Sequence, residues 1–252
     1  MDRICRVSAL AIVVLGLATA CSERPQAGAV TVFAAASLTE SFSSAEAAIE
    51  AAHAGLDVTF SFAGSGALVA QVRNGAPADV IATADGASMQ QLVDAGLVEP
   101  PVTFARNRLE ILVAPGNPKR VQGLADLVRT DLVVVVGDAG VPFGRYTAEA
   151  LTRAGVTVQP RSREQDVRAA VSKVTSGEAD ATVVYATDVA AVGTKGAGVA
   201  IPDALDGLAV YPIAVVKATK ARASAQVFVD EAVRGRIQEG LRAKGFLAPE
   251  QG

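Results

Sequence analysis

The sequence predicts an α/β fold of two lobes joined by a hinge, with a ligand cleft between the lobes. From Val30 onward, short apolar runs that are often β-branched alternate with helical segments, which is the pattern of βαβ units in parallel or mixed sheets. Half of the 252 residues are hydrophobic, and the chain is rich in Ala, Val and Gly, which suits tightly packed helices on buried strands. Two apolar segments also connect one set of units to a second and back, so a cleft between domains is expected.

The N-terminal segment, residues 1–21, is predicted to be a targeting signal. Two arginines precede the apolar run VSALAIVVLGLATAC, which has the length of a signal-peptide core and is short for a membrane span. The end of this run, LATAC, resembles a bacterial lipobox, in which Cys21 becomes the lipidated first residue; Ala18 stands where that motif usually has Leu. Residues 22–28 are expected to form a tether, and the lipid would hold the protein on the extracytoplasmic face of the cell membrane.

The cysteine and charge content exclude several kinds of site from the rest of the chain. Both cysteines, Cys5 and Cys21, lie in the leader, so the chain after it can form neither a disulfide nor a thiolate metal site. The formal net charge is −3, and nothing resembles a basic patch with interleaved aromatic residues, so nucleic acid is not an expected partner.

The order of the apolar runs predicts the lobes. Strands are expected at VTVFA, DVTFSF, ADVIATA, RLEILVAP, DLVVVVGD, VTVQ, ATVVYA and LAVYPIAVV. The segment FARNRLEILVAPGNP is expected to lead into the second lobe, and VYPIAVVKATK to lead back to a last helix around ASAQVFVDEAVRGRIQEGLRAKG. These crossings predict a first lobe from residues 29–104 and 217–252 and a second lobe from residues 105–216.

Two strand-to-helix junctions in the first half of the chain carry small residues and a hydroxyl. In VTVFAAASLTESF, Ser37 and Glu40 match a capping box that would make Ser37 the N-cap of a helix. Capping does not require the three preceding alanines, which are interpreted as room for a ligand close to the backbone. In FSFAGSGALVAQVRNG, Gly64 and Gly66 flank Ser65 and would expose backbone N–H groups, although a turn would use the same residues.

Two further junctions follow in the second half. Pro142 in VGDAGVPFGRYTAEAL suits the first turn of a helix and would leave the N–H groups of Phe143 and Gly144 free. The segment REQDVRAAVSKV predicts a helix that begins near Asp166, with Val167 as a first-turn donor. Because helix dipoles and unpaired N–H groups favour negative charge, the four junctions together predict a small, fully deprotonated oxyanion held without a lysine or arginine in contact.

Several spaced motifs resemble one family. TVFAAASLTESF, SFAGSGALVAQVRNGAPADVIATAD, VGDAGVPFGRYTAEAL, EQDVRAAVSKV and VVYATD are similar, in this order, to the molybdate-binding periplasmic proteins of molybdate ABC transporters. The likeness runs from about Val30 to the C-terminal helix. It implies the two-lobed type II periplasmic-binding fold, a monomer, and a receptor rather than an enzyme, whose partner is the membrane permease of the transporter.

The resemblance also implies the ligand set. The hydroxyls of Ser37, Ser65 and Tyr185 and the backbone N–H groups of Phe143 and Val167 would hold molybdate or tungstate, with no cofactor and no bare metal cation. From the residues alone, Tyr185 would be a buried strand tyrosine with a satisfied hydroxyl. Relatives often have Ala in place of Phe143, so the bulk of Phe143 could narrow or close the cleft.

Other conspicuous residues are expected to be structural. Asp79 and Asp85 flank a strand and could suggest a metal or acid–base site, but with the family resemblance they are expected to orient loops of the first lobe. The single histidine, His53, is expected on the surface near a helix end. Arg145 and Arg168 lie next to the expected donors and are expected to be solvated.

Two alternatives stay open at this stage. The same fold could bind sulfate or a small organic acid, because cavity size depends on fine backbone placement. A serine hydrolase that uses Ser65 is a different class, but the residues around Ser65 do not match the G-x-S-x-G nucleophile elbow. The only available base, His53, has no reason in the sequence to face Ser65.

Overall fold

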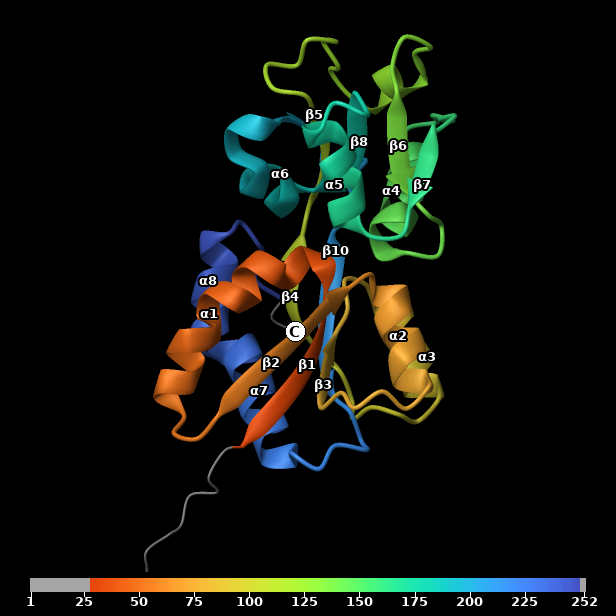
Figure 1. Cartoon of the computed structure of the whole chain (residues 1–252). Coiled ribbons are helices and arrows are strands. Elements are labelled where there is room, and N and C mark those ends of the chain that lie inside the picture. Colours follow the sequence, from red (N-terminus) through yellow and green to blue (C-terminus); the bar gives the residue numbers. More distant parts are fainter. Residues whose placement is uncertain (1–27, 250–252) are drawn as a thin grey trace, which may run out of the picture.

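The protein consists of two α/β lobes, one above the other in Figure 1. Two segments of the chain pass from one lobe to the other and join them. The computed structural model describes residues 28–249, so the predicted leader and Cys21 lie outside the described residues, as does nearly all of the predicted tether. This architecture confirms the predicted two-lobed α/β fold. No helix within residues 28–249 is long and apolar enough to cross a membrane.

The first lobe contains a five-stranded sheet in the order β2-β1-β3-β10-β4. Its strands are β1 Ala29–Ala35, β2 Asp57–Ala63, β3 Val80–Ala82, β4 Val102–Asn107 and β10 Ala209–Val215. Strand β1 pairs in parallel with β2 and β3, whereas β10 runs antiparallel to β3 and β4. The carboxyl ends of β1, β2 and β3 therefore meet at one edge, which faces the second lobe (Figure 1).

The second lobe repeats this arrangement with the order β7-β6-β8-β5-β9. Its strands are β5 Leu109–Val113, β6 Val134–Gly137, β7 Ser162–Glu164, β8 Ala181–Tyr185 and β9 Ala197–Ala200. Strand β6 is parallel to β7 and β8, and β5 is antiparallel to β8 and β9. The predicted strand VTVQ is wrong: residues 156–159 have no regular structure, and β7 forms three residues later.

The two crossings lie side by side and revise the predicted lobe boundaries. Strand β4 ends at Asn107 and β5 begins at Leu109, so the first crossing is at Arg108, later than predicted. The second crossing precedes β10, which was expected in the second lobe but pairs with β3 and β4. An ion pair between Arg108 and Asp203 ties the two crossings together.

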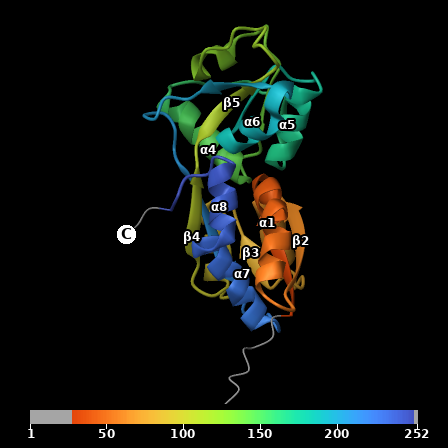
Figure 2. The same ribbon diagram turned by 90° about the vertical axis from the view of Figure 1, so that its left-hand side faces the viewer.

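Helices cover both faces of each sheet (Figures 1 and 2). In the first lobe, α2 and α3 pack on one face and α1, α7 and α8 on the other; in the second, α4 lies opposite α5 and α6. The helices are α1 Thr39–Ala52, α2 Ser65–Arg73, α3 Gly86–Asp94, α4 Pro142–Arg153, α5 Val167–Thr175, α6 Ala186–Val192, α7 Arg222–Arg234 and α8 Arg236–Ala243. Short 3-10 helices are η1 Ala36–Leu38, η2 Leu124–Val128 and η3 Gly193–Lys195.

The predicted last helix is two helices, α7 and α8, that meet at Gly235. The buried carboxylate of Glu231 accepts the backbone N–H of Arg236 at 2.6 Å and crowds the place where a Cβ on Gly235 would stand. Glycine permits this close approach, and the carboxylate satisfies an N–H that the break leaves without a helical partner. A periodic sequence pattern does not reveal such a break.

Buried aromatic rings fill the first lobe beneath the junction of the lobes. Phe42 contacts Phe104 and Phe228 with ring centroids 5.9 and 5.5 Å apart. Tyr211 on β10 continues this cluster toward the second lobe, where it meets Tyr185 with centroids 5.7 Å apart. The contact between Tyr211 and Tyr185 thus joins the two lobes, next to the place where the strands of both lobes end.

Candidate functional site

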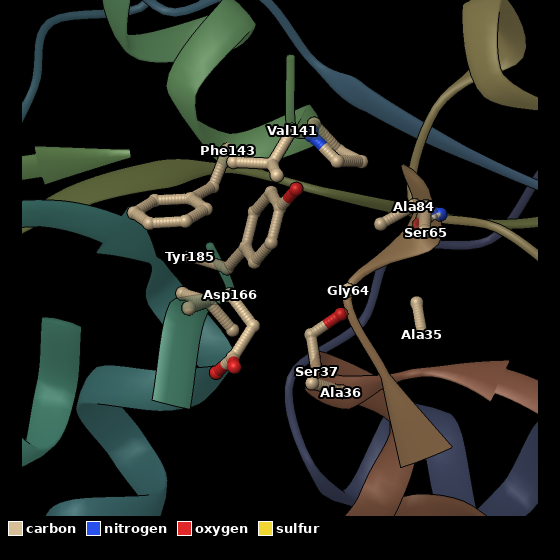
Figure 3. Close-up of a pocket in the computed structure, with 12 residues that line it drawn as sticks. Ala35, Ala36, Ser37, Gly64, Ser65, Ala84, Val141, Phe143, Asp166 and Tyr185 are labelled. Atoms are coloured by element: carbon tan, nitrogen blue, oxygen red, sulfur yellow. Dashed lines mark hydrogen bonds between the residues drawn. The ribbon is translucent and has the colours of Figure 1, made fainter. Parts of the chain in front are cut away.

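A small cavity lies between the lobes at the ends of their strands (Figure 3). The volume open to the centre of a water-sized sphere is about 20 Å³, somewhat more than the roughly 10–15 Å³ that one water needs, so the cavity has room only for a very small ligand. The lining residues are Ala35, Ala36, Ser37, Gly64, Ser65, Ala84, Val141, Pro142, Phe143, Asp166, Val167 and Tyr185. All five residues expected to bind the ligand are among them, with two from the first lobe and three from the second.

Ser37 lies in η1, between strand β1 and helix α1, and its hydroxyl is not a helix cap. Helix α1 begins only at Thr39, and no side chain caps it, so the predicted capping box is wrong. The reason is the intervening 3-10 turn, which moves the helix start beyond Ser37. The Ser37 Oγ lies 3.1 Å from the Tyr211 Oη instead, and the side chain reaches the cavity (Figure 3).

Ser65 is the first residue of α2, and its hydroxyl is fixed by the neighbouring strand. The backbone N–H of Ala84, just after β3, donates to Ser65 Oγ at 3.0 Å. This bond occupies an acceptor position of the hydroxyl and leaves its hydrogen for another partner.

At Gly64, immediately before Ser65, the backbones of the two lobes lie close together. A Cβ built on Gly64 would lie 2.5 Å from the backbone oxygen of Gln165 in the second lobe. The Gly64 φ and ψ of −60° and 139° are open to any residue. Its need for glycine therefore comes from the opposite lobe and not from backbone conformation.

Phe143 is the second residue of α4, where a backbone N–H has no partner within the helix. Pro142 precedes it at the helix start, as predicted. The Phe143 side chain is buried in the second lobe, where its ring edge fills the space left by Gly137. In Figure 3 this ring is turned away from Ser37 and Ser65, so its bulk does not close the cavity.

Val167 begins α5, and Asp166 is its N-cap. The Asp166 Oδ1 accepts the backbone N–H of Ala169 at 2.9 Å, which confirms the predicted helix start. Asp166 is the only charged residue among the described residues that line the cavity, and one of its two carboxylate oxygens, Oδ1, is engaged by the helix end. The Val167 N–H belongs to the first turn and is free of helical partners.

Tyr185 ends β8 and presents a hydroxyl with no protein partner within residues 28–249. The group is fully buried, and burial raises the pKa of Tyr185 well above its ordinary value, so the hydroxyl stays protonated and can donate. An unpaired buried polar group costs free energy, and such a group usually has a partner. The predicted satisfied strand tyrosine is therefore wrong, and the unpaired hydroxyl at the cavity wall requires a ligand or water.

Both arginines near the site are paired across the two lobes; Arg168 is exposed, as predicted, whereas Arg145 is partly buried and the prediction that it is solvated is wrong. Arg145 Nε donates to Asp85 Oδ2 at 2.7 Å, and Arg168 Nη1 donates to Glu40 Oε1 at 2.7 Å. Asp85 is buried and also caps α3 through the Ser88 N–H at 2.8 Å. The cations thus hold the lobes together at the sides of the cavity instead of lining it.

The other conspicuous polar residues are structural. Asp79 accepts the Thr31 N–H at 2.8 Å and the Thr219 hydroxyl at 2.5 Å, so it orients first-lobe loops as predicted. His53 follows α1 and its Nε2 lies 2.7 Å from Glu231 Oε1, away from the residues that line the cavity. Within residues 28–249 no group of three His, Cys, Asp or Glu side chains could hold a metal ion.

A buried acid, Asp188 in α6, lies behind Tyr185. Burial raises the pKa of Asp188 to about 7, although its hydrogen bond from the Tyr185 backbone N–H at 3.2 Å lowers it. Glu40 raises this pKa further, and Arg168 lowers it. Nothing in the sequence distinguishes Asp188 from an ordinary first-turn acidic residue.

The fold and the cavity define a two-lobed solute-binding protein. The family model of bacterial extracellular solute-binding proteins matches residues 30–247, and the chain belongs to this family. Among curated relatives, the molybdate-binding protein ModA of Mycobacterium bovis is 40% identical over 88% of this chain and 86% of its own. The ModA of Escherichia coli is 33% identical over 92% of this chain and 94% of its own.

Solved structures agree on the fold. The Azotobacter vinelandii periplasmic molybdate-binding protein superposes with a TM-score of 0.76 at 24% identity. The superposition covers 88% of this chain and 100% of that protein. The sulfate-binding protein SubI of Mycobacterium tuberculosis gives a TM-score of 0.78 at 20% identity, covering 88% of each chain. Proteins named for two different anions share the fold, so the fold alone does not select the anion.

We expect Gly64→Ala to hold the lobes apart. The added methyl would meet the Gln165 carbonyl, and overpacking of this kind costs about 1–3 kcal/mol, here in the closed arrangement only. Small-angle X-ray scattering should give a larger radius of gyration for Gly64→Ala. Gly66→Ala is the matched control, because its Cβ would lie 3.6 Å from Gly140 O, an ordinary contact. Equal radii for the two variants would contradict the prediction.

We expect Asp188 to make the protein less stable as pH rises. Its folded-state pKa of about 7 lies above the unfolded value of 3.8, so folding favours the protonated acid. The stabilisation is complete below the unfolded pKa and is lost as pH rises through the folded pKa, costing about 2–3 kcal/mol between pH 5 and pH 8. Urea unfolding at both pH values should show this loss in the wild type and a smaller one in Asp188→Asn. Identical losses would rule out the assignment to Asp188.

Proposed function

We propose that this protein is an extracytoplasmic receptor that binds molybdate, and tungstate with it, between its lobes and delivers the anion to the permease of an ABC transporter. The observation that carries the proposal is the cavity itself. Three hydroxyls and the N-termini of α4 and α5 converge on it, and no lysine or arginine lines it in the described part of the chain. Helix N-termini and neutral donors bind anions without a cationic side chain.

The donor set is divided between the lobes. Ser37 and Ser65 come from the first lobe, and Phe143, Val167 and Tyr185 from the second. An anion between them would be held completely only when the lobes are closed, as in hinge closure around a ligand. The interlobe ion pairs of Arg145 and Arg168 would then form together with the ligand contacts.

Molybdate is favoured over other oxyanions by the relatives and by the chemistry of the cavity. A relative that is 40% identical over most of the chain is named for molybdate binding. Sulfate is smaller, so donors fixed by backbone and strand ends would lie too far from its oxygens. Hydrogen phosphate carries a proton that needs an acceptor, and the hydroxyls and N–H groups face the anion as donors.

The remaining expectations concern partners and location. We propose that Cys21 carries a lipid that holds a monomeric receptor at the outer face of the membrane, where the permease would receive the anion. The family membership and the leader sequence support this placement.

A hydrolytic role for Ser65 has little support. Its Oγ is held by the Ala84 N–H, and the only histidine, His53, is paired with Glu231 and does not line the cavity. A serine nucleophile needs a general base within hydrogen-bond reach. We therefore propose that binding, and not catalysis, is the function of this site.

Calorimetric titration of the soluble chain that begins after Cys21 tests the cargo. Molybdate and tungstate should bind, whereas sulfate and phosphate should give no heat. The bound anion should also raise the thermal midpoint, because it binds only the native state. Equal or tighter binding of sulfate would leave the fold unchanged and overturn molybdate as the cargo.

Substitution of single hydroxyls tests the donor set. Ser37→Ala and Tyr185→Phe should each weaken molybdate binding by about 10- to 100-fold, because each removes a hydrogen bond to a charged ligand. Ser44→Ala is the control, since the Ser44 Oγ donates to the Ser41 carbonyl at 3.0 Å outside the cavity. Unchanged affinity in either site variant would remove that hydroxyl from the donor set.

A further inference from the structure

The hydroxyl of Ser37 has a second buried neighbour that the ligand set does not include. Ser37 Oγ and Tyr211 Oη lie 3.1 Å apart, although the two residues are 174 positions apart in the sequence. A serine hydroxyl has one hydrogen and two acceptor lone pairs. If Ser37 donates its hydrogen to an anion, the Tyr211 hydroxyl must be the donor in the bond between them.

The Tyr211 ring is held in one position. It is fully buried on β10 and touches Phe104, Tyr185 and Phe246, with centroids 6.4, 5.7 and 5.3 Å away. These rings surround it from both lobes and from the segment after α8. Its hydroxyl therefore reaches Ser37 without loss of side-chain freedom on ligand binding.

The neighbouring side-chain amide of Asn107 bears on the direction of the hydrogen bond between Tyr211 and Ser37. Asn107, the last residue of β4, accepts the Arg108 N–H at 3.0 Å through Oδ1 and donates from Nδ2 to Thr187 Oγ1 at 2.8 Å. Its carbonyl and amino groups are thereby assigned. The Asn107 side chain also lowers the pKa of Tyr211 by hydrogen bonding, against the larger effect of burial, which raises it. Either oxygen of the Ser37–Tyr211 pair could donate, and donation by Tyr211 is the direction that leaves the Ser37 hydrogen for a ligand.

The second serine shows the same arrangement. Ser65 Oγ accepts from the Ala84 N–H, a backbone group that cannot accept in return. With Tyr211 as the donor to Ser37, both serine hydroxyls accept a hydrogen bond from a group of the first lobe. Each then has its own hydrogen available to a ligand in the cavity. The hydrogen bond to Ser65 comes from a backbone N–H and cannot be removed by substituting a side chain. The hydrogen bond to Ser37 comes from one side chain, Tyr211, and can be removed.

We propose that Tyr211 is a positioning residue for anion selectivity: by donating to Ser37 Oγ, it occupies one of the two lone pairs and leaves the Ser37 hydrogen for the anion, which favours an oxyanion without a proton. This inference rests on the proposed function. Loss of the Tyr211 hydroxyl would leave both lone pairs of Ser37 free and let the hydroxyl turn, so Ser37 could more easily accept the P–O–H hydrogen of hydrogen phosphate. Tyr211 then affects both the affinity for molybdate and the discrimination against hydrogen phosphate, although it does not contact the anion.

Tyr211→Phe tests the proposal, because it keeps the ring and removes only the hydroxyl. Molybdate binding should weaken by about 10-fold, as for loss of one buried hydrogen bond. Phosphate, measured by displacement of molybdate, should not weaken, so the ratio of the two dissociation constants should fall by about 10-fold or more. Ser44→Ala is the control, because its hydroxyl donates to the Ser41 carbonyl within the first lobe and outside the cavity, and both affinities should stay unchanged.

A double-mutant cycle separates this role from general support of the fold. If Tyr211 acts through Ser37, Tyr211→Phe should have no further effect on molybdate affinity in a Ser37→Ala background. An equal loss in both backgrounds, or an unchanged molybdate-to-phosphate ratio, would overturn the proposal. Thermal melts of all variants identify any loss that comes from unfolding.

The wild-type titration distinguishes failure of this inference from failure of the proposed function. If the wild type binds sulfate instead of molybdate, the cargo is wrong, and the same cycle with sulfate still decides the role of Tyr211. If the wild type binds molybdate and Tyr211→Phe behaves like the wild type, the function stands and the inference falls. Binding of none of these oxyanions by the wild type would overturn both.

Discussion

The site depends on a backbone-to-backbone approach between the lobes, at Gly64 and Gln165. No side chain fits between them, since a single Cβ on Gly64 would lie 2.5 Å from the Gln165 oxygen. This approach brings the start of α2 toward the start of α5, and it places donors of both lobes around one small volume. Neither lobe alone has a complete set, because the Ser37 and Ser65 hydroxyls belong to one and the Tyr185 hydroxyl to the other. Under the proposed function, an anion would meet the whole set only when the lobes are closed.

The distribution of charge follows from this arrangement. A guanidinium inside the cavity would attract many anions with little regard to shape, whereas neutral donors must be aimed at each oxygen. Arg145 and Arg168 follow Phe143 and Val167 closely in the sequence, yet neither lines the cavity and each is engaged by a carboxylate of the opposite lobe, Asp85 or Glu40. They stabilise the closed arrangement and leave recognition to hydroxyls and helix ends. Long-range potential from these pairs is small, because each is neutral as a unit.

Buried polar groups around the cavity are organised by direction as well as position. The Ala84 N–H donates to Ser65 Oγ, and the Tyr211 hydroxyl lies within hydrogen-bond distance of Ser37 Oγ, so each serine has a polar partner within the first lobe. Tyr185 has an unpaired hydroxyl, which makes it the group with the most to gain from a ligand. The shared fold of proteins named for molybdate and for sulfate indicates that such local details, and not the architecture, choose the anion.

The sequence by itself determined the two lobes, the strand-to-helix junctions and, with the family resemblance, the residues that line the cavity. These are local signals: the alternation of apolar runs with helices, the proline at the start of α4 and the N-cap at Asp166. It failed at Ser37, where a 3-10 turn displaced the helix start, and at Gly235, where a buried carboxylate splits one helix into two. Only the tertiary structure decided the Tyr211–Ser37 contact across 174 positions and the Asp85–Arg145 pair across 60. The first contact joins distant segments of one lobe and the second joins the two lobes, and no periodicity or spacing in the sequence encodes the distance between such segments once they are folded.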